Sequence, residues 1–160
     1  MDGVEIRKFT AQDRDWLVEE HRDAYARSEG FDASFGILVS DILDSFLRDH
    51  DPACEAGWIA WQDGLRLGSI FCVKLDDKNA KLRLFLLTDK ARGKGLGRRM
   101  LTTCMGFARA QGYHDMKLWT HESHRAAGAL YAKTGWQLMS SAPVVSFGQA
   151  LIEQHWEITL

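Results

Sequence analysis

The chain has 160 residues, of which 46% are hydrophobic and 26% are charged, and its formal net charge at pH 7 is −2. This length suits one domain with a hydrophobic core and is too short for two ordinary ones, so we expect a single domain over residues 1–160. The nearly balanced charge gives no general attraction to nucleic acid or to an anionic membrane, so any recognition of phosphate must be local.

The cysteines and the N-terminal residues indicate in which cellular compartment the protein is expected. Three cysteines are present, an odd number, and none of them forms a CxxC pair, which favours buried thiols in a reducing compartment over a disulfide framework. Residues 1–16 lack the apolar core of a signal peptide, and no segment approaches the roughly 18 uncharged apolar residues of a membrane span. We therefore expect a cytoplasmic protein with no membrane partner.

The first half of the chain is predicted to contain a strand, two helices and three more strands. Residues 4–9 alternate like a strand, and Gly30 separates a first helix from a second one over residues 35–47, where apolar residues recur at helical spacing. Three runs separated by short turns then read as an antiparallel meander: residues 57–63, 65–75 and 80–88.

The second half is predicted to alternate helices with strands. A helix begins at Leu96 and is closed by Gly112. The following elements are a strand over 114–120, a helix over 123–135, and strands over 136–140 and 151–160. Pro52 and Pro143 are expected in loops. This order predicts an α/β fold with a mixed, mostly antiparallel twisted sheet of about seven strands and helices on both faces.

The segment ARGKGLGRR, residues 91–99, lies between a predicted strand and a predicted helix. It fails the Walker A pattern because a glycine follows Lys94, and it fails GxGxxG because position 98 is arginine. Glycines still allow a sharp turn and a close approach to a ligand, and the first N–H groups of a helix favour an anion. The segment therefore predicts a diphosphate site, with a tight turn carrying a basic rim as the alternative.

Two motifs resemble those of the GNAT superfamily of N-acetyltransferases. Arg92, Gly95 and Gly97 match the signature Arg/Gln-x-x-Gly-x-Gly/Ala, and ALYAKTGWQ (129–137) is similar to the family's later motif. More narrowly, AKLRLFLL, GFARAQGY, KLWTHES, VSFGQ and WEITL look like the acetyltransferase half of bacterial proteins that fuse a MarR-type DNA-binding domain to a GNAT domain. Because this sequence starts at the first GNAT strand, we expect a free-standing relative without the winged helix that binds an operator.

The resemblance implies that acetyl-CoA binds in a V-shaped opening between the strand ending at Leu87 and the strand ending at Thr120. The pyrophosphate would rest on the glycine loop, and the pantetheine arm would bond to the strand end. His124 stands where many relatives carry an asparagine that touches this arm. The cofactor-binding residues implied in this way are Leu86, Leu87, Thr88, Arg92, Gly93, Lys94, Gly95, Leu96, Gly97, Arg98 and His124.

The same resemblance implies direct attack by an amine within a ternary complex. The family's tyrosine falls on Tyr131, whose phenol, with an ordinary pKa near 10, can protonate the departing thiolate; a tyrosine packed in the core is the alternative. Glu29 and His21 lie in the region that shapes the acceptor pocket in this superfamily. Either could take the proton of the amine, and neither spacing nor charge selects between them. Taken alone, either residue more often has an ordinary surface role, and ordered water could take the proton instead. Glu29 is the one we assign to catalysis.

The acceptor is expected to be a small molecule with a primary amine. Tyr25 and Phe35 are candidate pocket walls, although aromatic residues at helical spacing more often belong to a core. Arg83 and Lys81 alternate with leucines, so a positive charge facing the cleft could receive the carboxylate of an amino-acid-like acceptor. Solvated edge positions are equally plausible for both. The substrate-binding candidates are His21, Tyr25, Phe35, Arg83 and Trp119.

Three alternatives accompany this interpretation. In HESH (121–124) the histidines are three residues apart and straddle a strand end and a helix start, so no metal site is expected. A non-catalytic acyl-CoA-binding or sensing module would share the glycine loop but would not need Tyr131. A nucleic-acid partner is disfavoured because no basic face studded with aromatic residues is present.

Since GNAT domains often dimerise, the closing residues 145–160 are also a candidate homodimer interface.

Overall fold

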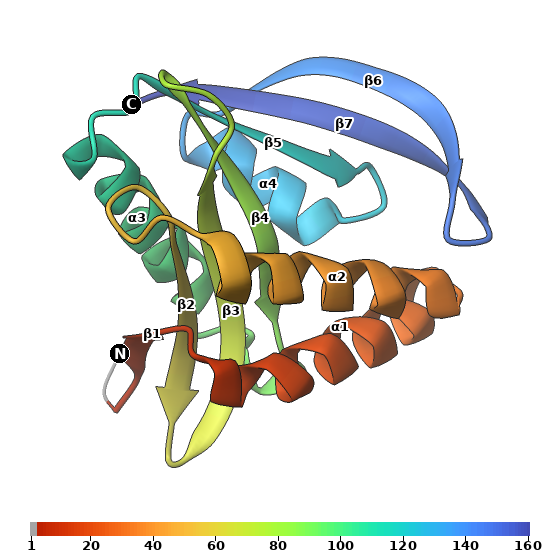
Figure 1. The fold of residues 1–160 in the computed structure, drawn as a ribbon. Helices are drawn as coiled ribbons and strands as arrows, with labels where there is room; N and C mark the ends of the chain where they lie inside the picture. Colours follow the sequence, from red (N-terminus) through yellow and green to blue (C-terminus); the bar gives the residue numbers. More distant parts are fainter. Residues whose placement is uncertain (1–2) are drawn as a thin grey trace.

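The computed structural model describes residues 3–160, within which the chain forms seven strands, four α-helices and two single-turn 3-10 helices (Figure 1). The first half contains β1 (Glu5–Lys8), η1 (Ala11–Asp13), α1 (Arg14–Glu29), α2 (Ala33–Asp49), β2 (Ala56–Gln62), β3 (Leu65–Lys74) and β4 (Asn79–Leu87). The second half contains η2 (Asp89–Ala91), α3 (Leu96–Ala110), β5 (Asp115–His121), α4 (Arg125–Lys133), β6 (Gln137–Ser146) and β7 (Gln149–Thr159).

All seven strands join one sheet in the order β1-β2-β3-β4-β5-β7-β6. The pair β4–β5 is parallel, and the other neighbouring pairs are antiparallel. Helices α1 and α2 cover one face of the sheet, whereas α3 and α4 cover the other (Figure 1). This arrangement confirms the expected α/β fold with a mixed, mostly antiparallel sheet and helices on both faces.

Each face of the sheet has its own hydrophobic core. On β3, Ile70 and Cys72 pack toward α3 and α4, while Phe71 between them packs toward α1 and α2, as the alternation of a strand requires. Helix α3 contributes Met100 and Leu101 to the first core. Helices α1 and α2 contribute residues at helical spacing to the second: Leu17, Val39, Leu43 and Phe46.

The sheet opens between its two central strands. Strands β4 and β5 pair only where Asn79–Lys81 lie beside Asp115–Lys117, and they then separate. Beyond this point the pairing of β4 with β3 is also irregular, with a register shift opposite Ser69–Phe71. Leu84 takes the left-handed conformation at this bulge (φ +51°), and the buried Ser69 hydroxyl donates a hydrogen bond of 2.6 Å to the Leu84 carbonyl. The bulge thus lies at the mouth of the opening.

One loop prediction was wrong. Pro143 lies inside β6, opposite Ile152 of β7, and β6 extends well beyond the predicted residues 136–140. Strand β6 is the outermost strand of the sheet, so its outer side forms no ladder. A proline lacks the N–H donor and is tolerated at such an edge.

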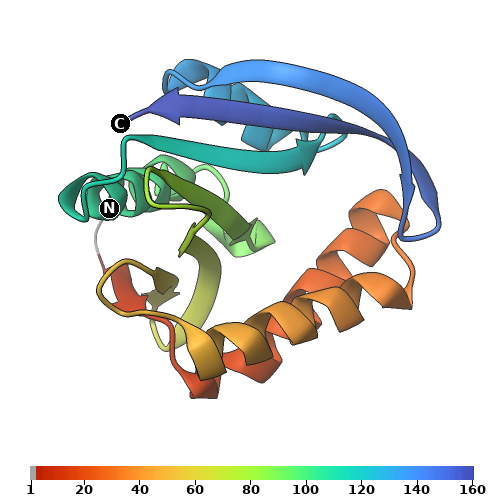
Figure 2. The same cartoon turned by 45° about the horizontal axis from the view of Figure 1, so that its top comes forward.

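The turn between α1 and α2 contacts the hairpin between β6 and β7, and both lie side by side in Figures 1 and 2. The Asp32 N–H donates to the Phe147 carbonyl (3.0 Å), and the Gln149 side chain donates to the Gly30 carbonyl (3.0 Å). The rings of Phe31 and Phe147 lie 4.9 Å apart. We call this contact the latch, because it joins elements from the two sides of the open sheet. Across residues 3–160, no helix combines the length and apolar character that crossing a bilayer requires.

Candidate active site

A cavity of about 620 Å³ lies between α1, the end of β4 and the beginning of α4. Helix α1 contributes Tyr25 and Glu29 to its wall, and the segment after β5 contributes His124. Seven residues predicted for the site line this cavity: Tyr25, Glu29, Leu86, Leu87, Thr88, Arg92 and His124. The cavity therefore brings together predicted site residues from three distant parts of the sequence.

The glycine loop connects the end of this cavity to α3. Gly93 and Gly95 have φ values of +74° and +69°, which a side chain would strain, and Gly95 is the N-cap of the helix. The first bond of α3 runs from the Arg99 N–H to the Gly95 carbonyl. The N–H groups of Leu96, Gly97 and Arg98 therefore have no acceptor within the helix and are free to bind an anion.

The cations of the loop differ in what they contact. Arg92 lines the cavity and makes an exposed contact of 3.5 Å with Asp89. Lys94 donates to the side-chain oxygen of Gln62 (2.9 Å), whereas Arg99 donates to the Val4 carbonyl (3.1 Å) and so helps to hold the N-terminal segment. Arg98 is exposed. Of the loop cations, Arg92 is the one on the cavity wall.

Sequence reasoning missed Arg125, Phe85 and Leu130, which also line the cavity. Arg125 is the first residue of α4, so it brings a second arginine to the wall from another element than Arg92, which lies before α3. No local motif marks Arg125, because its place depends on how α4 packs beside the opening of the sheet.

Thr88 has a buried hydroxyl with no hydrogen-bond partner within residues 3–160, and it lines the cavity. A buried hydroxyl left unpaired is costly, so it is expected to meet a polar ligand atom. Next to it, the β5-facing edge of β4 is free of pairing from Leu82 to Leu87. Together with the free N–H groups of α3, these features fit a ligand with a diphosphate and an extended arm that carries amides, as acetyl-CoA does.

Glu29 and His124 meet at the cavity wall. The distance from Glu29 Oε1 to His124 Nε2 is 3.6 Å, and these side chains are only 12% and 18% exposed. His124 Nδ1 lies 3.1 Å from the Thr120 hydroxyl, and its ring lies 4.9 Å from that of Tyr25. Burial lowers the pKa of His124 below its ordinary value, His121 lowers it further and Glu29 opposes the shift. The imidazole is therefore neutral at pH 7 and able to accept a proton.

Tyr131 is 3% exposed and packs among the rings of Phe85, Trp136 and Trp156. It does not line the cavity, although the preceding Leu130 does. Burial, with a smaller contribution from Tyr25, raises the pKa of Tyr131, and burial raises that of Tyr25 to about 12. Both phenols therefore keep their protons at neutral pH, and the Tyr131 hydroxyl forms no hydrogen bond within residues 3–160.

His21 and Phe35 belong to an aromatic cluster behind the cavity wall. His21 is 2% exposed, and its Nδ1–H donates to the Leu17 carbonyl (2.9 Å). Burial lowers the pKa of His21 to about 4. The rings of Phe35 and Tyr25 lie edge to face at 4.8 Å. Of the two candidate bases, Glu29 lines the cavity and His21 does not.

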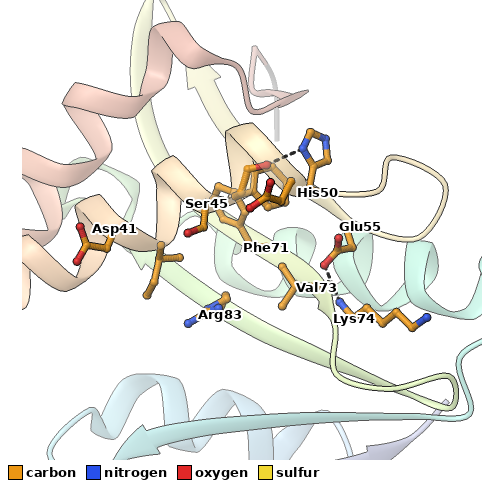
Figure 3. Close-up of a pocket in the computed structure, with 11 residues that line it drawn as sticks. Asp41, Ser45, His50, Glu55, Phe71, Val73, Lys74 and Arg83 are labelled. Atoms are coloured by element: carbon orange, nitrogen blue, oxygen red, sulfur yellow. Dashed lines mark hydrogen bonds between the residues drawn. The ribbon is translucent and has the colours of Figure 1, made fainter.

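Arg83 and Trp119 lie outside this cavity. Arg83 lines a second cavity of about 380 Å³ between α2 and strands β3 and β4 (Figure 3). Trp119 is 40% exposed and stacks on His155 at 4.6 Å. In HESH, the rings of His121 and His124 are 5.5 Å apart. Within residues 3–160, no group of three or more His, Cys, Asp or Glu side chains is arranged to hold a metal ion.

Known proteins resemble the chain in both sequence and fold. Rat N-acetyltransferase 8 is 31% identical over 104 residues, which cover 62% of this chain and 46% of that protein. Human N-acetyltransferase 8B is 29% identical over 104 residues, which cover 62% of this chain and 44% of that protein. The chain thus spans about half the length of the curated relatives it matches.

Two solved structures show the same fold. An acetyltransferase from Streptococcus agalactiae superposes with a TM-score of 0.77 at 20% identity, covering 100% of both chains. A Salmonella typhimurium protein, solved with its cofactor acetyl-CoA, gives a TM-score of 0.76 at 17% identity, covering 99% of this chain and 95% of the other.

The sequence model of the acetyltransferase (GNAT) family matches residues 13–136. This range runs from η1 through the glycine loop and the opened strands to the end of α4, and so contains every residue found on the cavity wall. With the sequence match and the fold in agreement, the chain belongs to the acetyltransferase (GNAT) family.

Proposed function

We propose that this protein transfers the acetyl group of acetyl-CoA to the primary amine of a small molecule by direct attack in a ternary complex. The observation that carries the proposal is the opening between β4 and β5, where the cavity, the Glu29–His124 pair and the glycine loop converge. An elongated ligand with a diphosphate at one end suits this arrangement.

The chain would hold acetyl-CoA mainly through its backbone. The N–H groups of residues 93–98 would bind the pyrophosphate, and Arg92 and Arg125 would add charge from two sides. Thr88 and the free edge of β4 would bond to the amides of the pantetheine arm. When bound, acetyl-CoA would supply the activated acyl group, and the separation of β4 from β5 beyond Lys81 would leave its carbonyl accessible.

Glu29, with His124 beside it, would take the proton that the amine loses. The amine nitrogen forms a bond to the carbonyl carbon while the bond from that carbon to sulfur breaks, and Tyr131 would give its proton to the departing thiolate. Tyr131 regains a proton from solvent, which balances the proton taken by Glu29 and His124. The raised pKa of Tyr131 keeps this donor protonated at neutral pH.

The test is a calorimetric titration of acetyl-CoA into the protein, with desulfo-CoA and ADP as comparisons. Saturable one-site binding is expected, followed by release of free CoA when a panel of primary amines is supplied. An absence of binding at millimolar ligand would show that the loop is only a glycine-rich turn and would overturn the proposal.

A second candidate function is acyl-CoA sensing without catalysis. The observation that favours it is the burial of Tyr131 behind the cavity wall, because the residue expected to protonate the departing thiolate does not line the cavity. Tight binding of acetyl-CoA with no acetylation of any amine would support the sensor.

Several expectations of the sequence stay predictions. They are a single domain over residues 1–160, of which residues 1 and 2 lie outside the described residues, a relationship to MarR–GNAT fusion proteins, a bacterial source and a cytoplasmic location. Homodimerisation, the absence of a nucleic-acid or membrane partner and the absence of a metal stay predictions as well.

A further inference from the structure

Two cations of β4 face the side of the sheet that α1 and α2 cover. Ala80 and Leu82 point into the opposite core, so Lys81 and Arg83, which alternate with them, point toward the α2 side. Figure 3 shows Arg83 below α2 at the wall of the 380 Å³ cavity. Both side chains are partly buried.

Arg83 has no hydrogen bond or ion pair with any residue in 3–160, whereas three other partly buried cations of this protein have acidic partners. Arg14 pairs with Asp44 (3.0 Å), Arg66 with Asp13 (2.9 Å) and Lys117 with Glu157 (3.7 Å). A guanidinium that is partly withdrawn from water without an acidic partner is unfavourable, and burial lowers the pKa of Arg83 accordingly.

The acids near Arg83 do not neutralise it. Glu55 accepts hydrogen bonds from the backbone N–H groups of Asp51 and Lys74, and Asp49 pairs with Arg48 (3.0 Å). Asp41 is exposed and lines the same cavity (Figure 3), and it forms no ion pair with Arg83 within residues 3–160.

Lys81 has a similar environment. Its Nζ lies 5.0 Å from the centre of the Trp119 ring, and it forms no ion pair in the described chain. Burial and the charge of Arg83 lower the pKa of Lys81, while Glu153 opposes the shift. Lys81 and Arg83 thus place two like charges side by side with no anion between them. A ligand that brought an anion to Arg83 would relieve both the burial and the repulsion.

The position of Arg83 relates this anion to the chemistry. Arg83 directly precedes the bulge at Leu84, in the part of β4 that no longer pairs with β5. A group bound over Arg83 or Lys81 and a group bound over the bulge are separated by one to three residues of strand, or roughly 3–10 Å. A small molecule that carries both an amine and an acid can span this separation.

We propose that Arg83, supported by Lys81, binds a carboxylate of the acceptor, so that the substrate carries a primary amine and a carboxylate in one small molecule. The inference rests on the proposed acetyl transfer and names its substrate class. The planar guanidinium binds a carboxylate through two parallel hydrogen bonds, which also orients the amine toward the bulge.

The experiment compares each of a set of amino acids (glycine, β-alanine, 4-aminobutyrate and lysine) with its carboxamide in an assay of CoA release. We expect the best acid to exceed its carboxamide in kcat/KM by about tenfold or more, the effect of a charge-assisted hydrogen bond. Arg83→Gln should reduce this ratio to near one. Lys74→Gln, which removes a cation from the exposed rim of the same cavity, should keep the ratio.

The outcomes separate this inference from the proposed function. If acids and carboxamides are acetylated equally, or if Arg83→Gln keeps the preference, acetyl transfer stands and the carboxylate site is refuted. If nothing is acetylated, the binding of the same acids to the CoA-bound protein is measured by calorimetry, which tests the carboxylate site alone. Binding that Arg83→Gln abolishes would support the carboxylate site while acetyl transfer fails, and no binding of any acid would overturn the site.

Discussion

Two histidines of this protein, His21 and His124, show how the surroundings of a side chain decide whether it can take part in proton transfer. His21 donates to the carbonyl one helical turn earlier and is sealed by aromatic rings, so its pKa falls to about 4. His124 is also partly buried, but Glu29 lies 3.6 Å from it and the cavity is open beside it. The same side chain is therefore a packing element in one place and a candidate proton acceptor in the other.

Replacing Glu29 tests the candidate base. We expect Glu29→Gln to lower kcat/KM by on the order of 100-fold. Because Glu29 raises the pKa of His124, its loss should also move the acid limb of the residual activity to lower pH. The matched control is Glu20→Gln, which removes a carboxylate from the same helix and cavity wall. A profile of kcat/KM against pH that is the same in both variants would contradict the role of Glu29.

Tyr131→Phe tests the candidate acid. Loss of the hydroxyl should lower kcat by about 100-fold or more while the Kd of acetyl-CoA, measured by calorimetry, stays within about twofold. Tyr113→Phe is the control, because the Tyr113 hydroxyl donates to the Cys54 carbonyl (2.8 Å) away from the cavity. That variant should lose about 1 kcal/mol of stability and keep its kcat. Unchanged turnover in Tyr131→Phe would remove this tyrosine from the mechanism and favour a different acid.

His21 predicts a pH dependence of stability. Its pKa is 6.5 in an unfolded chain and about 4 in the fold, so between these values only the unfolded state binds the proton. Stability is therefore lost as the pH falls, by about 2 kcal/mol between pH 7 and pH 5. Urea unfolding gives the free energy of unfolding of the wild type and of His21→Leu at both pH values. The decrease between pH 7 and pH 5 should be about 2 kcal/mol smaller in the variant. If the free energy of unfolding depends on pH in the same way in both proteins, His21 is not buried in its neutral form.

At the scale of elements, the glycine loop acts through backbone shape. No atom lies within 4 Å of a side chain built on Gly95, so a substitution there is resisted by its φ of +69° and not by crowding. Gly106 in the middle of α3 is equally uncrowded but has an ordinary helical backbone. Substituting these two glycines of α3 therefore distinguishes the effect of backbone conformation from the effect of added side-chain volume.

Gly95→Ala should lower the free energy of unfolding by about 1 to 2 kcal/mol and weaken acetyl-CoA binding, because it strains the turn that presents the free N–H groups. Gly106→Ala should raise stability by about 0.5 to 1 kcal/mol and leave binding unchanged. Chemical denaturation and calorimetry provide both quantities. Equal binding by the two variants would mean that the loop does not hold the ligand.

The elements were largely predictable from the sequence, whereas their mutual positions were not. Periodicity and glycine punctuation gave the order of strands and helices, since both signals are local. The length of β6 was missed because Pro143 reads as a strand breaker unless the strand is known to lie at an edge. The pairing of Glu29 with His124 depends on α1 and α4 meeting across the opened sheet, which no local pattern encodes.

At the scale of the whole molecule, the latch is one of the contacts that join the two sides of the open sheet. Rings of Phe31 and Phe35 on the helical side each lie 4.9 Å from that of Phe147 in the hairpin. The distant ends of α1, α2, β6 and β7 thereby stay together although β4 and β5 diverge between them. The latch and the Glu29–His124 contact (3.6 Å) thus both span the opening at this end.

Phe147→Ala should release the hairpin without unfolding the sheet. We expect faster hydrogen exchange at the amides of residues 146–150, with protection retained at residues 153–159, where β7 pairs with β5. Val145→Ala changes a residue of the same hairpin that is 83% exposed and should leave exchange unaltered. If Phe147→Ala exchanges like wild type, the ring contacts do not hold the hairpin.

The short pairing of β4 with β5 has a consequence for solubility. Only three residues of each strand are paired, so the ligand-free protein carries two unprotected edges in the interior of its sheet, where most proteins have none. Such edges can template the addition of a foreign strand, and a ligand lying along β4 would cover one of them. Preparations kept saturated with the ligand should therefore resist aggregation on storage better than stripped ones, quite apart from any gain in melting temperature.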